Sequence, residues 1–282
     1  MDNLAYSELS RFENLHRGFD RMGARLKLSR LTDRRALEMP YLIDIDSDRR
    51  GEYFDLRIAD DEIQLNVAIV QPKERHLILQ ARGGWRRERG KGPKLNSPPE
   101  KLLCGHDERH WFVAGVPGNA MTVEQAKEAL KPEEVQFIQR LRGLRSKERL
   151  ARHNEVFLRQ GEWFFVPAPE LEVNQMMLLY NEPLSRGTGS KPHIVELAVR
   201  TAGNLVYICR EYPRGLSAMR YEALIKNSPN KARLNWSTAR INARVYARGK
   251  VRHPDHGTLE LPFWHRVYMN REVSSKPIVF LD

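Results

Sequence analysis

Residues 52–82 have the sequence EYFDLRIADDEIQLNVAIVQPKERHLILQAR, in which three apolar segments are separated by short polar ones. The segments at residues 52–59, 62–70 and 76–82 have the alternation and the β-branched content that are typical of strands. Residues 71–75 (QPKER) predict the turn between the last two strands, because proline presets the φ angle that a turn needs. This part of the chain therefore favours antiparallel hairpins.

Strand and turn patterns of the same kind recur further along the chain. Residues 101–105 (KLLCG) and 110–117 (HWFVAGVP) predict another hairpin, and residues 161–169 (GEWFFVPAP) predict a buried strand. Near the C-terminus, two expected strands flank Pro-Asp-His-Gly at residues 254–257, which is strong turn chemistry.

Helical patterns are fewer and lie in groups. Residues 4–26 place apolar side chains at steps of three to five, which predicts an amphipathic helix. Thr122 and Gln125 have the spacing of a capping box and mark the clearest helix start. Short helices are also expected at residues 193–200 and 216–226.

These patterns together predict an α+β fold made mainly of antiparallel hairpins with a few clustered helices. We expect two parts. Residues 1–152 hold an N-terminal helix, hairpins and a basic helix, and residues 153–282 form a C-terminal α+β part. A single domain is the alternative, since 282 residues suit one large domain or two ordinary ones.

The composition is that of a soluble globular protein, with 41% hydrophobic and 29% charged residues. The longest apolar stretches fall far short of the roughly 20 residues that a membrane span needs, so no span is expected. The N-terminal sequence MDNLAYSELSRFENLH lacks the pattern of a secretion signal. The two cysteines, Cys104 and Cys209, fit a reducing compartment, although a bridge between them stays open. We expect a cytoplasmic protein.

The formal net charge of +11 is concentrated in two windows of the sequence. Residues 82–94 (RGGWRRERGKGPK) and residues 140–152 (RLRGLRSKERLAR) each carry six Lys/Arg and one Glu, which together account for nearly all of the excess. Such basic segments attract acidic partners, above all a phosphate backbone. Nucleic acid is therefore the expected partner, and an acidic protein or an anionic membrane surface is the alternative.

The first window is a Gly/Pro/basic loop with a tryptophan among its arginines. An indole can stack on a base while neighbouring guanidinium groups hold phosphates, which favours RNA or another single strand. The candidate nucleic-acid-binding residues of this loop are Trp85, Arg86, Arg87, Arg89, Lys91 and Lys94.

The second window continues a helix that is expected to begin after Pro132, where two glutamates follow. At about 100° per residue, its basic side chains fall over the apolar face of Val135, Ile138 and Leu141. One straight helix would have to bury and expose the same face, so we expect a bend or stop near Gly143, with the basic half in solvent. The candidate binding residues here are Arg142, Arg145, Arg149 and Arg152.

Four of the nine histidines form two pairs in predicted hairpin turns, namely His106 with His110 and His253 with His256. If these turns converge, the imidazoles and nearby carboxylates can bind a divalent metal. The same residues can also act as base and acid in metal-free cleavage of RNA. The plain alternative is that Asp, His, Pro and Gly simply form tight turns.

A zinc-hydrolase helix is not expected at residues 106–110 (HDERH), in spite of a superficial likeness to the HExxH motif. Asp107 stands where that motif has glutamate, and the flanking segments look extended. His193 and His265 are expected to be structural, since each adjoins an apolar segment. The sequence contains no Walker loop, no dinucleotide-binding glycine motif and no GxSxG elbow.

Three functions remain in order of preference. The first is a nucleic-acid-binding protein that uses the basic loop and the basic helix. The second is a nuclease or other phosphodiester hydrolase with His106, His110, His253 and His256 as catalytic residues. The third is an assembly protein whose basic loop docks onto an acidic partner. No cofactor is expected beyond a divalent metal at the histidine turns.

Overall fold

The computed structural model of the chain describes residues 12–33, 35, 39–59, 63–82, 99–186 and 191–273. These residues form two compact units. Unit 1 comprises the described residues up to Leu150 together with residues 270–273, and unit 2 comprises the described residues of Ala151–Met269. Within the described ranges, every helix is too short or too polar to cross a bilayer.

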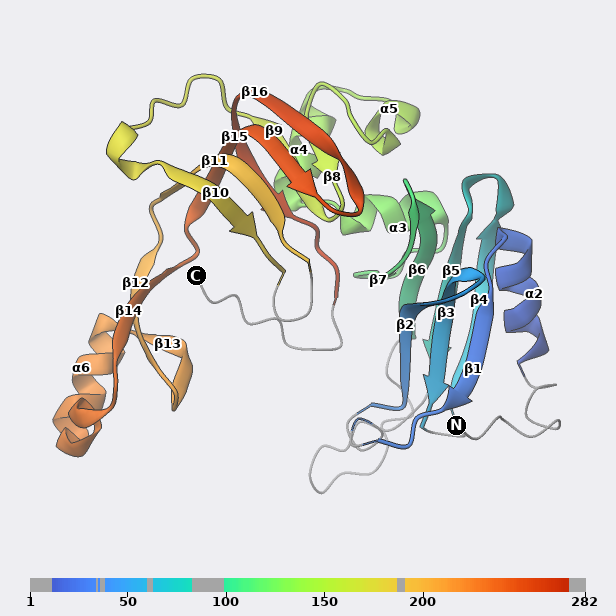
Figure 1. Ribbon diagram of the computed structural model, residues 1–282, viewed down its shortest axis with the longest axis horizontal. Coiled ribbons are helices and arrows are strands. Elements are labelled where there is room, and N and C mark those ends of the chain that lie inside the picture. The colour runs from blue at the N-terminus through green and yellow to red at the C-terminus, as the bar shows by residue number, and fades with distance from the viewer. Residues whose placement is uncertain are drawn as a thin grey trace. The chain divides into compact units, whose positions relative to one another are not determined.

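Unit 1 is built on two sheets (Figure 1). One has the strand order β1-β3-β2, in which β1 runs parallel to β3, and the other is the antiparallel meander β4-β5-β6-β7. The strands are β1 (Leu26–Arg30), β2 (Tyr41–Asp48), β3 (Gly51–Ile58), β4 (Gln64–Gln71), β5 (His76–Arg82), β6 (Glu100–Asp107) and β7 (His110–Gly115).

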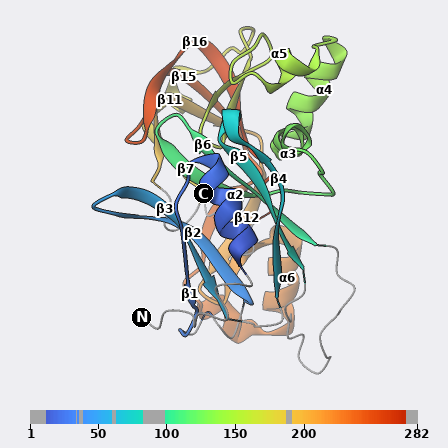
Figure 2. The ribbon, with the colours of Figure 1, turned by 90° about the vertical axis from the view of Figure 1, so that its right-hand side faces the viewer.

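The core of unit 1 forms between these sheets and helix α2 (Glu13–Met22). In Figure 2, α2 lies beside strands of both sheets. Phe19 of α2 packs its ring against Phe54 of β3, with 4.8 Å between the centroids, and both side chains are fully buried. The helix ends where Gly23 adopts φ = +79°, a conformation in which glycine has no Cβ penalty. The expected helix therefore stops short, and Leu26 lies in β1.

Unit 1 has three other helices among its described residues, and the first of them begins at the cap that the sequence predicts. They are α3 (Val123–Leu130), α4 (Glu133–Leu141) and α5 (Ser146–Leu150), with a 3-10 turn at Pro72–Glu74 in the β4–β5 hairpin. Thr122 Oγ1 accepts a hydrogen bond from Gln125 N at 3.2 Å, and Gln125 Oε1 accepts one from Met121 N at 2.7 Å. The stop expected near Gly143 is confirmed, because α4 ends at Leu141 and Gly143 has φ = +66°.

The polypeptide returns to unit 1 after leaving unit 2. Arg271 N donates to Leu130 O, and Val273 N donates to Gly115 O on β7. This return was not expected from the sequence, which predicted two consecutive parts with a boundary after residue 152.

Unit 2 is built on one antiparallel six-stranded sheet in the order β10-β11-β15-β16-β9-β8. Its core contains the buried residues Trp163, Phe165, Val195 and Val251. The strands are β8 (Leu158–Gln160), β9 (Trp163–Pro167), β10 (Leu179–Leu184), β11 (His193–Thr201), β15 (Arg244–His253) and β16 (His256–Met269), with a 3-10 turn at Gln175–Met177.

A smaller module is inserted between β11 and β15. It comprises a three-stranded sheet in the order β13-β12-β14 and one helix (Figure 1, orange). Thr201 pairs with Arg244 where β11 ends and β15 begins, so the module leaves the large sheet at that end. Its elements are β12 (Asn204–Cys209), β13 (Tyr212–Ser217), α6 (Ala218–Asn227), a 3-10 turn at Pro229–Arg233 and β14 (Ser237–Ile241).

The structure is thus a sheet-dominated α+β protein, as expected in general kind. The helix expected at residues 193–200 is wrong, because this segment is strand β11, which pairs with β10 and β15 inside the large sheet. Cys104 and Cys209 are both free thiols.

Candidate metal centre

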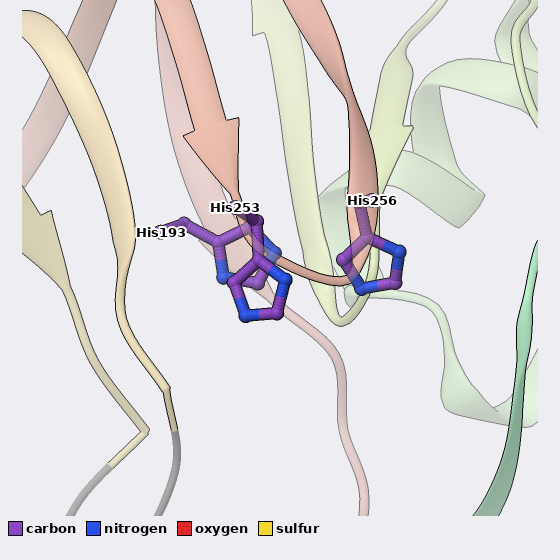
Figure 3. A group of neighbouring side chains, drawn as sticks. All are labelled: His193, His253 and His256. Carbon is purple, nitrogen blue, oxygen red and sulfur yellow. The ribbon is translucent and has the colours of Figure 1, made fainter.

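Three histidines of unit 2 meet at one end of its large sheet. His193 begins β11, His253 ends β15 and His256 begins β16. His253 and His256 are register partners across the two-residue turn Pro254-Asp255, and β11 pairs with β15 through Ile194 and Arg252. The three side chains therefore gather at the same end of neighbouring strands, as Figure 3 shows.

The three rings are close enough to share one ion. One ring nitrogen of each histidine lies within 4.8 Å of the others. His193 stacks on His253 with 4.1 Å between ring centroids and on His256 with 5.5 Å. A zinc ion about 2.0–2.1 Å from each nitrogen would hold tetrahedral ligands about 3.3 Å apart, so the rings would close by at most roughly 1.5 Å.

His193 is the most informative member, because it is buried without a hydrogen-bonding partner. The residue is 1% exposed, and neither Nδ1 nor Nε2 has a partner. Buried polar atoms in native proteins are almost always paired, so an orphaned pair of ring nitrogens needs a cause. Burial, followed by repulsion from His253 and His256, lowers the pKa of His193 to about 3. Its ring is therefore neutral at pH 7 and keeps a lone pair for a ligand.

His253 is half-buried and held by two long contacts. Its Nδ1 accepts from Asp255 N at 3.1 Å, and its Nε2 lies 3.3 Å from the carbonyl oxygen of Lys191. Because Nδ1 accepts, the neutral ring carries its proton on Nε2. A metal ion on either nitrogen would replace one of these contacts. Burial and the neighbouring His256 lower the pKa of His253 as well.

Gly161, in the tight turn between β8 and β9, keeps the space beside these rings open. Its φ is +57°, and a Cβ built there would lie 3.1 Å from Nε2 of His193 and 3.1 Å from Nε2 of His256. Both Nε2 atoms thus border the same small space. A side chain at position 161 would enter this space, so glycine favours both the backbone conformation and access to the two nitrogens.

Two more buried polar atoms without partners belong to residues of β8 and β9, on either side of the turn that contains Gly161. Gln160 is 1% exposed and donates from Nε2 to the carbonyl of Gly257 at 2.6 Å, while its Oε1 has no partner. Trp163 lies edge-on to His193, with 6.4 Å between ring centroids, and its Nε1 also has no partner. These unpaired atoms, together with the two unpaired ring nitrogens of His193, fit a part of unit 2 that holds an ion and its water.

Carboxylates also lie close to the cluster. Asp255, in the turn, forms an ion pair with Lys191 at 2.8 Å, which fixes the β15–β16 turn to the segment before β11. The charges of Asp255 and Glu162 both act to raise the pKa of His253, against the effect of burial. The site therefore has negative charge within reach of a cation.

The other predicted pair of histidines lies in unit 1, on the β6–β7 hairpin. His110 Nδ1 is 2.5 Å from Glu52 Oε1, and the ring of His106 lies edge-on to Trp111 with 4.9 Å between centroids. Both flanks of HDERH are strands, as expected, so the helical zinc motif does not form. The four expected catalytic residues, His106, His110, His253 and His256, are therefore divided between the two units, and a site that joins them stays a prediction.

The structure agrees only in part with the expectation that the basic side chains after Gly143 lie in solvent. Arg142 and Arg145 are exposed, and Arg145 pairs with Glu148 at 3.1 Å. Arg149 and Arg152 are instead half-buried, and the carbonyl of Arg149 accepts from the buried Lys131 Nζ at 2.6 Å. The basic half thus turns partly inward, since α5 folds back to satisfy Lys131. The loop residues Trp85, Arg86, Arg87, Arg89, Lys91 and Lys94 lie outside the described residues.

Sequence reasoning found two of the three clustered histidines and missed the third. Residues 253–256 carry obvious turn chemistry, and the structure has that turn. His193 is expected from the sequence to be structural, because it adjoins an apolar segment. The signal that could have found it is proline at position 192 before an apolar run with two valines, which fits the start of a strand as well as a helix. Comparison with protein-family models, with curated proteins and with solved structures gave no match.

Proposed function

We propose that unit 2 binds a divalent transition-metal ion through His193, His253 and His256. The observation that carries the proposal is His193, which is 1% exposed and has no hydrogen bond on either ring nitrogen. A metal ion supplies the partner that this ring lacks. Imidazole suits zinc, copper, iron and nickel, and a set of three histidines is a ligand set of catalytic zinc.

Three protein ligands leave a position for water, and zinc makes such a water acidic near neutral pH. This chemistry connects the site to the second function expected from the sequence, hydrolysis of a phosphodiester, with the reacting groups in unit 2 alone. The free thiols of Cys104 and Cys209 fit the reducing, cytoplasmic setting that belongs to this proposal.

Zinc binding to the untagged, metal-stripped protein tests the proposal directly. Equilibrium dialysis is expected to show one tightly bound zinc ion per chain. Each of the variants H193L, H253Q and H256Q is expected to weaken zinc affinity by at least about 100-fold, which is more than the loss of an outer contact costs. H110Q is the matched control, since it removes a half-buried histidine of unit 1. No tight equivalent in the wild type would refute the site. Equal loss in H110Q would favour a site shared by both histidine pairs.

Nucleic-acid binding is the second candidate function, and the exposed cations of the chain favour it. Arg142, at the end of α4, is exposed and forms no ion pair within the described part of the chain. It belongs to the second basic window, and the first window carries the Trp/Arg loop. Arginine suits phosphate because its planar fork can bind two oxygens at once.

A salt series with fluorescent single-stranded RNA and duplex DNA tests this second function. Tight binding with a steep dependence of log K on log salt is expected, weakened when Arg86, Arg87 and Arg89 are reversed to glutamate. Absence of binding at low salt would instead leave an acidic protein as the partner of the basic segments.

A further inference from the structure

The inserted module at residues 204–241 carries a local excess of positive charge that is spread through its sequence. It contains seven Lys/Arg and two Glu. No run of cations marks it, because these residues are distributed over β12–β13, α6, the 3-10 turn and β14. The fold brings them together on one small body (Figure 1).

Most of these cations face solvent without partners. Lys231 pairs with Glu211, but the other six are exposed, and none of the six forms an ion pair with a described residue. Five of the seven cations are arginines. The unpaired, exposed residues are Arg210, Arg214, Arg220, Lys226, Arg233 and Arg240.

Aromatic rings hold the module together in place of an aliphatic core. The structure describes every residue of the module, and Val206 is the one buried residue among them. Tyr207 stacks on Tyr221 with 4.1 Å between centroids, and Tyr212 stacks on Trp236 with 5.5 Å. All four rings are half-buried, so part of each ring remains on the surface.

The module combines unpaired arginines with half-buried aromatic residues, and this combination matches one class of ligand well. Single-stranded nucleic acid offers regularly spaced phosphates to the guanidinium groups and unstacked bases to the rings. Apolar surface is also available, because Leu205 is 46% exposed and Met219 is 79% exposed. An acidic peptide would use the charge of the module but not its rings.

We propose that the module at residues 204–241 is a docking surface for single-stranded nucleic acid, an inference that rests on the nucleic-acid-binding function proposed above. This module is separate from the metal centre. The module joins the large sheet where β11 ends at Thr201, whereas His193 stands at the opposite end of the same strand. The nine residues of β11 place its two ends about 26 Å apart, at about 3.3 Å per residue.

The test is RNA binding by the full chain with three module cations reversed, R210E/R214E/R233E. A labelled single-stranded 30-mer RNA is titrated across a KCl series from 50 to 200 mM. The reversal is expected to weaken binding at least ten-fold and to lower the slope of log K against log salt by about 2, at about 0.7 per lost phosphate contact. The control R49E/R50E/K73E makes the same change in net charge at exposed sites of unit 1.

Each outcome decides one question. If the wild type binds no RNA at 50 mM KCl, the nucleic-acid-binding function falls and the module assignment falls with it. If the wild type binds but the module variant matches its control, only the module assignment is wrong. If poly-glutamate displaces the RNA as well as unlabelled RNA does, the surface is a protein-docking site. Zinc affinity is expected to be unchanged in both triple variants.

Discussion

The G161A substitution tests whether the space beside the three histidines is a binding site. Gly161 has φ = +57°, so alanine there adopts a left-handed conformation that costs about 1 kcal/mol. The added methyl would also lie 3.1 Å from Nε2 of both His193 and His256, closer than ordinary van der Waals contact. The rings must then move by a few tenths of an ångström, away from the space that they border.

Two measurements separate the backbone cost from the effect on the site. Urea unfolding of the metal-free protein is expected to show a loss of about 1–2 kcal/mol, mostly from the strained φ. Zinc affinity is expected to fall at least ten-fold, which corresponds to about 1.4 kcal/mol. The loss of unfolding free energy is distinct from the loss of zinc affinity, because the first is measured without metal.

G143A is the matched control for this experiment. Gly143 also has positive φ, at +66°, but a Cβ there meets nothing within 4 Å. Alanine at position 143 should therefore carry the strain alone and leave zinc affinity unchanged. The reasoning fails if G161A binds zinc as tightly as the wild type does, since the methyl would then occupy no space that the ion needs.

Three further predictions concern stability. The folded-state pKa of His193, about 3, lies below the ordinary value of 6.5, so the unfolded chain binds more protons. The metal-free protein should therefore lose stability as pH falls from about 6.5 towards 3, and a urea series across this range that shows no loss would contradict the neutral, buried ring. H193L should unfold at the same or higher urea than the metal-free wild type, because it removes two unpaired buried nitrogens. Zinc at 100 times the wild-type Kd should then stabilise the wild type by about 2.7 kcal/mol and H193L by at most about 0.4 kcal/mol, as thermal unfolding with and without zinc can show. T122A should destabilise unit 1 by about 1 kcal/mol through loss of the α3 cap, whereas T122S, which keeps the hydroxyl, should unfold like the wild type.

Local chemistry made much of the fold predictable. The Thr122 cap, the stop at Gly143 and the Pro254-Asp255 turn each depend on a few neighbouring residues, and the structure has all three. Alternation and turn residues likewise indicated the hairpins of both units. These features need no knowledge of the rest of the chain.

Features that depend on distant partners were not predictable. The apolar run after His193 fits a helix or a buried strand. It forms a strand because it pairs with β10 and β15, which are distant in the sequence. Burial of Lys131, whose Nζ bonds the carbonyl of Arg149, draws part of the basic helix inward. The cations of the inserted module are scattered along the sequence, so only the fold shows that they belong to one small module.

Zinc K-edge X-ray absorption of the untagged protein, loaded with one equivalent of zinc, tests the metal centre most directly. Three nitrogen ligands at about 2.0–2.1 Å with the outer-shell signature of imidazole are expected, and H193L should leave at most two. A first shell of oxygen alone, or three imidazole ligands retained in H193L, would contradict a zinc site formed by His193, His253 and His256.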